Sequence, residues 1–229
     1  MRIVALSDQH GHLPRIPECD VLVVAGDVCP DRFGPFLAVH HPEQQKAWFD
    51  RTARPWLTAA PAAHKILTWG NHDWCGQACS FRGDSLANAR DGAVRIVVDE
   101  LTHVRCGGAL LSVWATPWSN RFLNWAFMKP PAQLETVYAA IPHGVDILVS
   151  HQPPYGCGDL GLGSIKLRAA IRRVKPKLVI CGHIHDGFGR FECDGTTVYN
   201  VSVVDEQYDS FANLRRLTSP SARAGPNPR

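Results

Sequence analysis

The sequence has no long apolar run: none of its hydrophobic stretches approaches the roughly 20 residues that a membrane-spanning helix requires. It also has no large excess of charge of one sign. Its 229 residues carry a formal net charge of +3, which is too small to indicate a membrane surface or a nucleic-acid partner. We therefore expect no membrane partner, and nucleic acid is disfavoured because the sequence shows no basic groove or DNA-binding segment.

A secretory signal and paired cysteines are also missing from the sequence. The opening MRIVALSDQHG holds only a short apolar run, and no small-residue cleavage site follows it. The eight cysteines are scattered without a C-x-x-C pair, and a chain of this size does not need disulfides for its stability. We therefore expect reduced thiols and a cytoplasmic location.

Short apolar runs and helical patterns alternate along the chain. Near-continuous apolar runs, typical of strands buried on both faces, occupy residues 2–8, 20–27, 64–73, 145–151 and 177–183. Helical patterns cover 42–60, 131–141 and 163–176, and Pro55 should kink or split the first. Further strands are expected at 93–100, 102–106, 109–116, 189–193 and 196–204, with a hairpin turn between the last two.

This order of elements predicts a layered α/β domain with more sheet than a simple doubly wound fold. We expect residues 1–210 to form a single domain. The polar, proline-containing residues 211–229 are expected to form a C-terminal tail that is at least partly disordered.

Each of the five apolar runs is followed by side chains that can bind a metal ion. In chain order these are Asp8 and His10, Asp27, Asn71 and His72, His151, and His183 and His185. In α/β sheets, ligands gather beyond the carboxyl ends of the strands, so we expect these side chains to meet in one crevice. Glycines at 26, 70 and 182, each directly before a ligand, permit tight turns and close backbone approach.

Two pairs, Asp8/His10 and His183/His185, have the spacing i, i+2, which in extended chain places both side chains on one face. Imidazole, carboxylate and amide oxygen together suit Mn, Fe, Zn, Ni or Co as divalent ions. The absence of a thiolate among these residues argues against a structural zinc site. The candidates are too many for one ion but right for two if a carboxylate bridges them. Asp27, alone at its strand end, is the natural bridge.

At these residues the chain resembles the calcineurin-like metallophosphoesterase superfamily, with DQH at 8–10, GD at 26–27, GNHD at 70–73, His151 and GHIH at 182–185. The resemblance implies an αββα sandwich of two mixed β-sheets flanked by helices. It also implies that His72 is the catalytic histidine. One metal ion would be held by Asp8, His10, Asp27 and His185, and the second by Asp27, Asn71, His151 and His183.

A narrower similarity rests on TPWSNRFLNWAFM, HQPPYGCGDL and GHIHDGFG. These segments look like the small metallophosphoesterase-domain branch with phosphodiesterase activity on cyclic nucleotides. The resulting hypothesis is a metal-dependent hydrolase of small-molecule phosphodiesters, cyclic nucleotides among them. A hydroxide activated by two metal ions would attack phosphorus, and His72 would donate a proton to the departing oxygen.

The alternatives are a phosphomonoesterase or nuclease of the same superfamily, or a non-catalytic metal-binding scaffold. The scaffold is disfavoured because every ligand of the pattern is present, and so is His72. The sequence does not indicate an oligomeric state.

Substrate contacts are less defined. Protein phosphatases of the superfamily carry G-D-x-x-D-R-G, whose arginine grips the phosphate, but GDVCPDRFG places Asp31 and Arg32 one position later. We therefore do not assign that role to Arg32. Trp118 and Tyr155 are candidate substrate contacts: a helical turn would align Trp118 with Phe122 and Trp125, and Tyr155 lies in a Pro- and Gly-rich loop. Core packing and a plain connecting loop are the respective alternatives.

Overall fold

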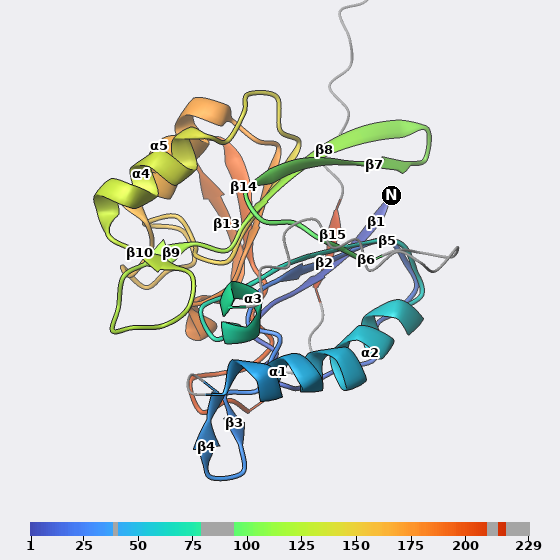
Figure 1. The fold of residues 1–229 in the computed structure, drawn as a ribbon. Helices are drawn as coiled ribbons and strands as arrows, with labels where there is room; N and C mark the ends of the chain where they lie inside the picture. The colour runs from blue at the N-terminus through green and yellow to red at the C-terminus, as the bar shows by residue number, and fades with distance from the viewer. Residues whose placement is uncertain (39–40, 79–93, 210–214, 219–229) are drawn as a thin grey trace, which may run out of the picture.

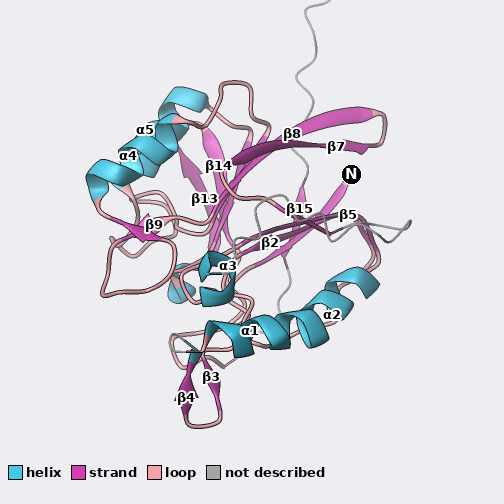
Figure 2. Ribbon diagram, viewed as in Figure 1, coloured by secondary structure: helices cyan, strands magenta, loops and turns pink. Residues whose placement is uncertain are grey.

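The structure is a computed structural model that describes residues 1–38, 41–78, 94–209 and 215–218. Two mixed β-sheets face each other, and helices cover their outer faces (Figure 1 and Figure 2). The predicted αββα sandwich is therefore confirmed. Among the described residues, no helix has the length and apolar character needed to span a membrane.

The first sheet has the order β15-β1-β2-β5-β6. Its strands β1, β2, β5 and β6 run parallel, and β15 is antiparallel to β1. The strands are β1 (Arg2–Leu6), β2 (Cys19–Ala25), β5 (Ala62–Thr68), β6 (Val94–Ile96) and β15 (Arg215–Thr218). Strand β15 lies within the predicted C-terminal tail. The first sheet therefore includes residues beyond the boundary expected at residue 210, and residues 210–214 and 219–229 lie outside the described residues.

The second sheet has the order β13-β14-β12-β11-β8-β7, with antiparallel strands at both edges and parallel ones between them. The predicted hairpin joins β13 to β14, and its turn residues Asp194 and Gly195 both have positive φ, as a tight two-residue hairpin requires. The strands are β7 (Glu100–Cys106), β8 (Ala109–Thr116), β11 (Ile147–Ser150), β12 (Leu178–Cys181), β13 (Gly189–Cys193) and β14 (Thr196–Asn200).

Successive side chains of β1 point alternately into two different cores, which explains why the central strands are apolar throughout. Ile3 and Ala5 point into the core between the two sheets, whereas Val4 and Leu6 pack with residues of the helices on the outer face. Because successive side chains of a strand point to opposite faces, a strand covered on both sides needs an unbroken apolar run. On the second sheet, a third core joins Leu148 of β11 to the helical residue Leu167.

The outer helices are α1 (Pro42–Trp48) and α2 (Arg54–Ala59) on the first sheet, and α4 (Pro131–Ala139) and α5 (Ile165–Val174) on the second (Figure 1). A π-helical segment, Phe49–Ala53, separates α1 from α2. The predicted split at Pro55 is thus present, since proline lacks an N–H and its ring crowds the carbonyl four residues earlier. Ser164 caps α5 by accepting a hydrogen bond from the Leu167 N–H at 3.2 Å.

The remaining elements are short. Strands β3 (Arg32–Phe33) and β4 (Phe36–Leu37) form one small hairpin, and β9 (Ser119–Asn120) pairs in parallel with β10 (Met128–Lys129). Helix α3 (Trp74–Ala78) follows the GNHD segment, and a 3₁₀ turn spans His185–Gly187. The segment between β9 and β10 contains turns rather than the helical turn considered for Trp118, Phe122 and Trp125.

The expectation of reduced thiols is wrong for one pair. Cys157, in the loop after β11, forms a disulfide with Cys193 of β13, 36 residues later. The two cysteines carry no recognisable spacing because only the sheet order brings their segments together. Free cysteines among the described residues are Cys19, Cys29, Cys75, Cys106 and Cys181. The disulfide weakens the argument for a cytoplasmic location, which rested on reduced thiols.

Candidate metal centre

The predicted ligands meet at the carboxyl ends of β1, β2, β5, β11 and β12. Two groups of predicted ligands form there, each with its ligand atoms within 4.8 Å of one another, and a third group of the same kind, made of His10, Asp31 and His72, adjoins them. The first group consists of Asp8, His10 and His185, and the second of Asp27, His151 and His183. Their convergence follows from parallel strands, because the loops that follow such strands leave the sheet at the same edge.

In the first group, the Nε2 atoms of His10 and His185 are 3.4 Å apart. His185 Nε2 lies 3.7 Å from Asp8 Oδ1. The other ring nitrogens are already engaged: His185 Nδ1 donates to the Asp205 carbonyl at 2.9 Å, and His10 Nδ1 donates to Asp31 Oδ1 at 3.1 Å. Because these oxygens only accept, the protons sit on Nδ1 and the Nε2 lone pairs face the group.

The second group has the same design. His151 Nδ1 donates to the Ala25 carbonyl at 2.9 Å, which directs Nε2 toward Asp27 Oδ2 at 3.1 Å and Asn71 Oδ1 at 2.8 Å. The ring of His183 lies 5.0 Å from that of His151. Asp27 Oδ2 is also 4.0 Å from His10 Nε2 in the first group. This carboxylate therefore stands between the two groups.

Electrostatics of the second group favour a bound cation. Burial opposes protonation of His151, but the charge of Asp27 raises its pKa to about 9. Burial, together with the positive charge of His151, lowers the pKa of His183 to about 3. A proton on His151 thus offsets the buried negative charge of Asp27, a role that a bound divalent ion would take over. The donors, carboxylate, imidazole and amide oxygen, fit such an ion, and none of the group members is a thiolate.

Several ligands hold a left-handed backbone conformation: φ is 59° at Asp8, 45° at His10, 54° at Asp27 and 69° at His183. Such strain in non-glycine residues costs on the order of 1–3 kcal/mol each and is typical of functional sites. The expectation of extended chain through these pairs is therefore wrong. His183 and His185 do not share one face, and each joins a different group because the backbone turns between them.

Close approach is clearest at two of the three glycines before ligands. A Cβ at Gly182 would overlap Ser7 Oγ and Asp8 Oδ2, and one at Gly70 would overlap Asp27 Oδ1 and the His151 ring. Only a residue without a side chain lets these loops pack against the ligands.

Asp73, which closes the GNHD segment, braces the loops from behind. Its buried carboxylate accepts hydrogen bonds from the backbone N–H groups of Asp27 at 2.9 Å, Cys29 at 3.0 Å and Gly70 at 2.9 Å. These bonds tie the loop after β2 to the loop after β5, and so fix Asp27 relative to His72.

His72 stands beside the second group without joining it. Its backbone N–H donates to Asp27 Oδ1 at 2.7 Å, and its Nδ1 donates to Asp31 Oδ1 at 2.7 Å. The Trp125 ring lies against it, with ring centroids 4.2 Å apart. Burial lowers the pKa of His72, but the negative charges of Asp27 and Asp31 outweigh burial and raise the pKa from its ordinary value. The imidazole is therefore suited to carry a proton.

Asp31 was missed as a site residue in the sequence. Burial alone would raise the pKa of its carboxyl, but hydrogen bonds from His10 and His72 hold the pKa far below its usual range. The one-residue shift in GDVCPDRFG still lets the aspartate reach the histidines, whereas Arg32 lies exposed in β3. The Asp31-Arg32 pair, which matches the D-R of the protein-phosphatase motif one position later, was the sequence signal that could have identified Asp31.

A cavity of about 660 Å³ opens above the two groups. Tyr208, also missed in the sequence, lines it, with its ring 4.5 Å from that of His10. The lining includes the polar residues Asp27, Asn71, His72, Asn120, Arg121, Gln152, His183, His185, Asp186 and Glu206, and the apolar residues Phe122, Trp125, Met128, Leu160, Leu162 and Ile184.

The two predicted substrate contacts do not belong to this lining. The Trp118 indole N–H donates to Asp99 Oδ2 at 2.6 Å, and its ring packs against Phe127. Tyr155 is 44% exposed in the loop after β11. Trp118 therefore has a packing role, and Trp125 of the same aromatic stretch takes the position beside His72.

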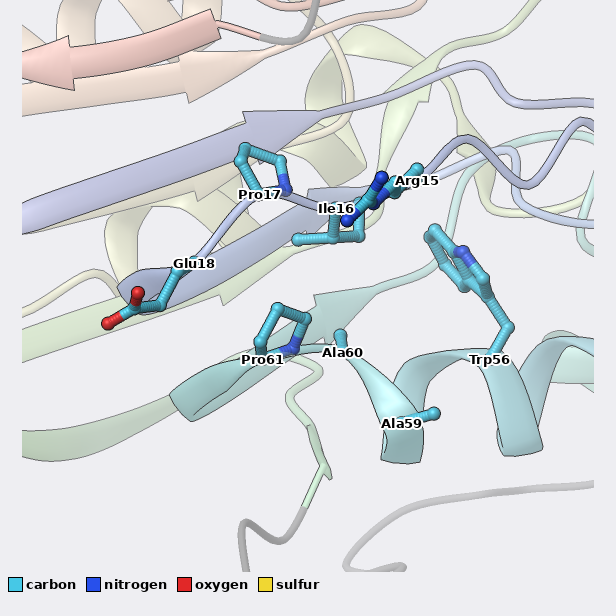
Figure 3. Close-up of a pocket in the computed structure, with 8 residues that line it drawn as sticks. All are labelled: Arg15, Ile16, Pro17, Glu18, Trp56, Ala59, Ala60 and Pro61. Atoms are coloured by element: carbon cyan, nitrogen blue, oxygen red, sulfur yellow. The ribbon is translucent and has the colours of Figure 1, made fainter.

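A second cavity, of about 570 Å³, lies between residues 15–18 and the C-terminal end of α2 (Figure 3). Ile16, Trp56 and Pro61 line it, and the Trp56 indole donates to the Pro14 carbonyl at 2.9 Å. Its lining contains no histidine and a single carboxylate, Glu18, so it has none of the donors of a metal centre.

Comparison with known proteins gives consistent matches. The family model for calcineurin-like phosphoesterase matches residues 1–187. The chain is 29% identical to human metallophosphoesterase domain-containing protein 1 over an alignment of 235 residues. The alignment covers 90% of this chain and 67% of that protein. It is 25% identical to UPF0046 protein T07D4.2 of Caenorhabditis elegans, covering 91% of this chain and 57% of the other.

Among solved structures, TT1561 of Thermus thermophilus has a similar fold. The TM-score is 0.57 at 16% identity, and the match covers 95% of this chain and 98% of that one.

Proposed function

The chain belongs to the calcineurin-like phosphoesterase family, and on this premise we propose that it hydrolyses phosphodiesters, cyclic nucleotides among them, with two divalent metal ions. The family assignment makes it a metal-dependent phosphoesterase. The phosphodiester preference, the number of ions and the roles of individual residues are our proposal.

Asp8, His10, Asp27 and His185 would bind one ion, and Asp27, Asn71, His151 and His183 the other. The position of Asp27 between the two groups supports a bridging role. The donors suit Mn, Fe, Zn, Ni or Co. When bound, two such ions supply a water of lowered pKa and neutralise charge that develops on a phosphoryl group.

His72 would donate a proton to the departing ester oxygen. The observation that carries this role is the hydrogen bond from His72 Nδ1 to Asp31, which leaves Nε2 as the nitrogen that can reach a substrate in the cavity. The raised pKa favours the protonated form of the ring, which a proton donor requires. Such a general acid contributes roughly 10²–10⁴-fold to the rate.

The cavity wall favours a diester over a monoester. Phe122, Trp125 and Leu162 provide apolar surface, and Arg121 is the one Lys or Arg among the lining residues. A phosphodiester carries a single negative charge and a second organic group, which such a wall can accommodate. A monoester dianion would bring a second negative charge to a wall that has one cationic side chain, Arg121.

A substrate panel with each metal tests the proposal. The metal-loaded protein should hydrolyse chromogenic diesters and 3′,5′- or 2′,3′-cyclic nucleotides faster than chromogenic monoesters. Faster hydrolysis of monoesters would replace the proposal with a phosphomonoesterase. Bound metal without hydrolysis of any ester would support the non-catalytic scaffold.

A further inference from the structure

We propose that the rim of the cavity selects phosphodiesters in which one ester group is apolar, either alkyl or aryl, and that Phe122, Leu160 and Leu162 bind this group. The inference rests on the proposed function and specifies which open-chain diesters the site prefers, since a cyclic nucleotide has no separate ester group. On this inference, the polar metal centre binds the phosphate, and the apolar rim beside it determines which ester group is preferred.

Several exposed large hydrophobic side chains line this cavity. Ten are exposed among the described residues, and four of these belong to the cavity lining. The four are Phe122, Leu160, Leu162 and Tyr208. Single exposed apolar residues are common and need no explanation, whereas a cluster beside a cavity marks a binding surface.

Core packing does not account for the rim. Phe122 is 68% exposed, Leu160 66% and Leu162 64%, although all three line the cavity. Most of each side chain is therefore available to a bound molecule. Covering that apolar area would favour binding in proportion to the area removed from water.

The loops that carry the rim are held in place. Asp159 Oδ2 accepts hydrogen bonds from the N–H groups of Gly156 and Gly163, each at 2.9 Å, and the neighbouring Cys157 is fixed by its disulfide. Asn120 Nδ2 donates to the Gly163 carbonyl at 3.2 Å, which links this loop to the one that carries Phe122. The apolar surface is thus preorganised, and ordering it on binding costs little.

Two leucines of these loops adopt a backbone conformation that disfavours their side chains. Leu160 has φ of 47° and Leu123 has φ of 55°, in the left-handed region where glycine or asparagine would be less strained. A solvent-exposed leucine brings no packing to compensate for that strain. Strained residues of this kind are typical of ligand contacts.

The rim and the metal centre belong to one cavity, so one molecule can occupy both. Arg121 precedes Phe122 in the chain and lines the same cavity, where its charge complements a phosphate. It forms no ion pair among the described residues. The phosphodiester would lie between Arg121 and the metal centre, and its apolar group on the rim.

The test uses p-nitrophenyl phosphodiesters whose second group is methyl, butyl or hexyl, with the full-length, manganese-loaded protein. Each methylene that becomes buried should raise kcat/KM by up to about 3–4-fold. The double variant Leu160→Asn/Leu162→Ser should flatten this dependence on chain length. Asparagine is chosen because it tolerates the left-handed backbone. Leu110→Ser, at a leucine of β8 that is 55% exposed and does not line the cavity, is the control and should leave the dependence unchanged.

Calorimetric binding of methyl, butyl and hexyl methylphosphonates, diester analogues in which a P–CH3 group replaces the nitrophenyl ester, separates this inference from the proposed function. Affinity that rises with chain length in the wild type and not in the double variant supports the rim even if no diester is hydrolysed. Equal affinity for all three analogues, or the same dependence in the double variant, would overturn it.

Discussion

The floor of the cavity consists of buried polar side chains, whereas its rim consists of exposed apolar ones. In the ligand groups at and beneath the floor, Asp8, Asp27 and His151 are at most 1% exposed, and each is oriented by backbone hydrogen bonds at a strand end. On the rim, Leu160 and Leu162 are mostly exposed and are held by a loop. The floor and the rim thus reverse the usual arrangement of apolar side chains inside and polar ones outside. Buried polar groups are costly without a binding partner, and an exposed apolar cluster is typical of a binding surface.

The difference indicates what each region requires from outside the chain. The floor lacks positive charge that a metal ion would supply, and the rim lacks apolar contact that a substrate would supply. Substitutions on the floor should therefore change metal content, and substitutions on the rim should change substrate selectivity.

Asp27→Ala should have the largest effect. Without this carboxylate neither group keeps its full donor set, so both ions should be lost or weakly held, and turnover should fall by more than the roughly 10²–10⁴-fold expected for loss of a general acid. Metal content by mass spectrometry and hydrolysis of a chromogenic diester check this. Two ions retained at full occupancy in Asp27→Ala would rule out the bridging role.

His72→Ala should reduce turnover by roughly 10²–10⁴-fold while leaving the ions of the two proposed groups in place, because His72 belongs to neither of them and lies instead with His10 and Asp31. kcat and metal content are measured on the same preparation. Loss of the ions, or an unchanged kcat, would contradict the role of His72 as proton donor.

Asp31→Asn should reduce kcat by roughly 10–100-fold, the usual effect of removing a carboxylate that orients a functional histidine. Asp31 raises the pKa of His72, so its neutralisation lowers that pKa. A proton donor is inactive once deprotonated, and the decline of the pH–rate profile at high pH should therefore move to lower pH. Asp50→Asn, on the remote outer helix, is the control. An unmoved profile in Asp31→Asn would show that Asp31 is only structural.

Removal of the disulfide by Cys157→Ser/Cys193→Ser should act on the rim and spare the floor. The free energy of unfolding should decrease by about 2–4 kcal/mol, since the cross-link restricts the unfolded chain. Metal content should not change, because neither cysteine belongs to a ligand group. Denaturant unfolding and metal analysis provide the comparison, and loss of metal would show that the two regions are not independent.

Strand ends could be located from the sequence because strands buried on both faces leave unbroken apolar runs, each followed by a polar residue. That pattern predicted a layered α/β domain and the meeting of Asp8, Asp27 and His183 at one edge, whereas the αββα sandwich was implied by the family resemblance. Side-chain direction could not be predicted in the same way: the left-handed backbone at His183 sends it to a different group from His185.

Contacts that depend on tertiary packing were also hidden. Asp31 reaches His72 across 41 residues, and Tyr208 reaches His10 from the other end of the chain. The disulfide joins two loops that only the sheet order brings together. The rim left no periodic signal, because exposed leucines in a loop look the same in sequence as leucines folded into a core.

A crystal structure of the protein grown with manganese, with the ions located by anomalous scattering, tests the central claim most directly. The account predicts two anomalous peaks, with a carboxylate oxygen of Asp27 coordinating both ions. A single peak, or two peaks of which only one contacts Asp27, would contradict it.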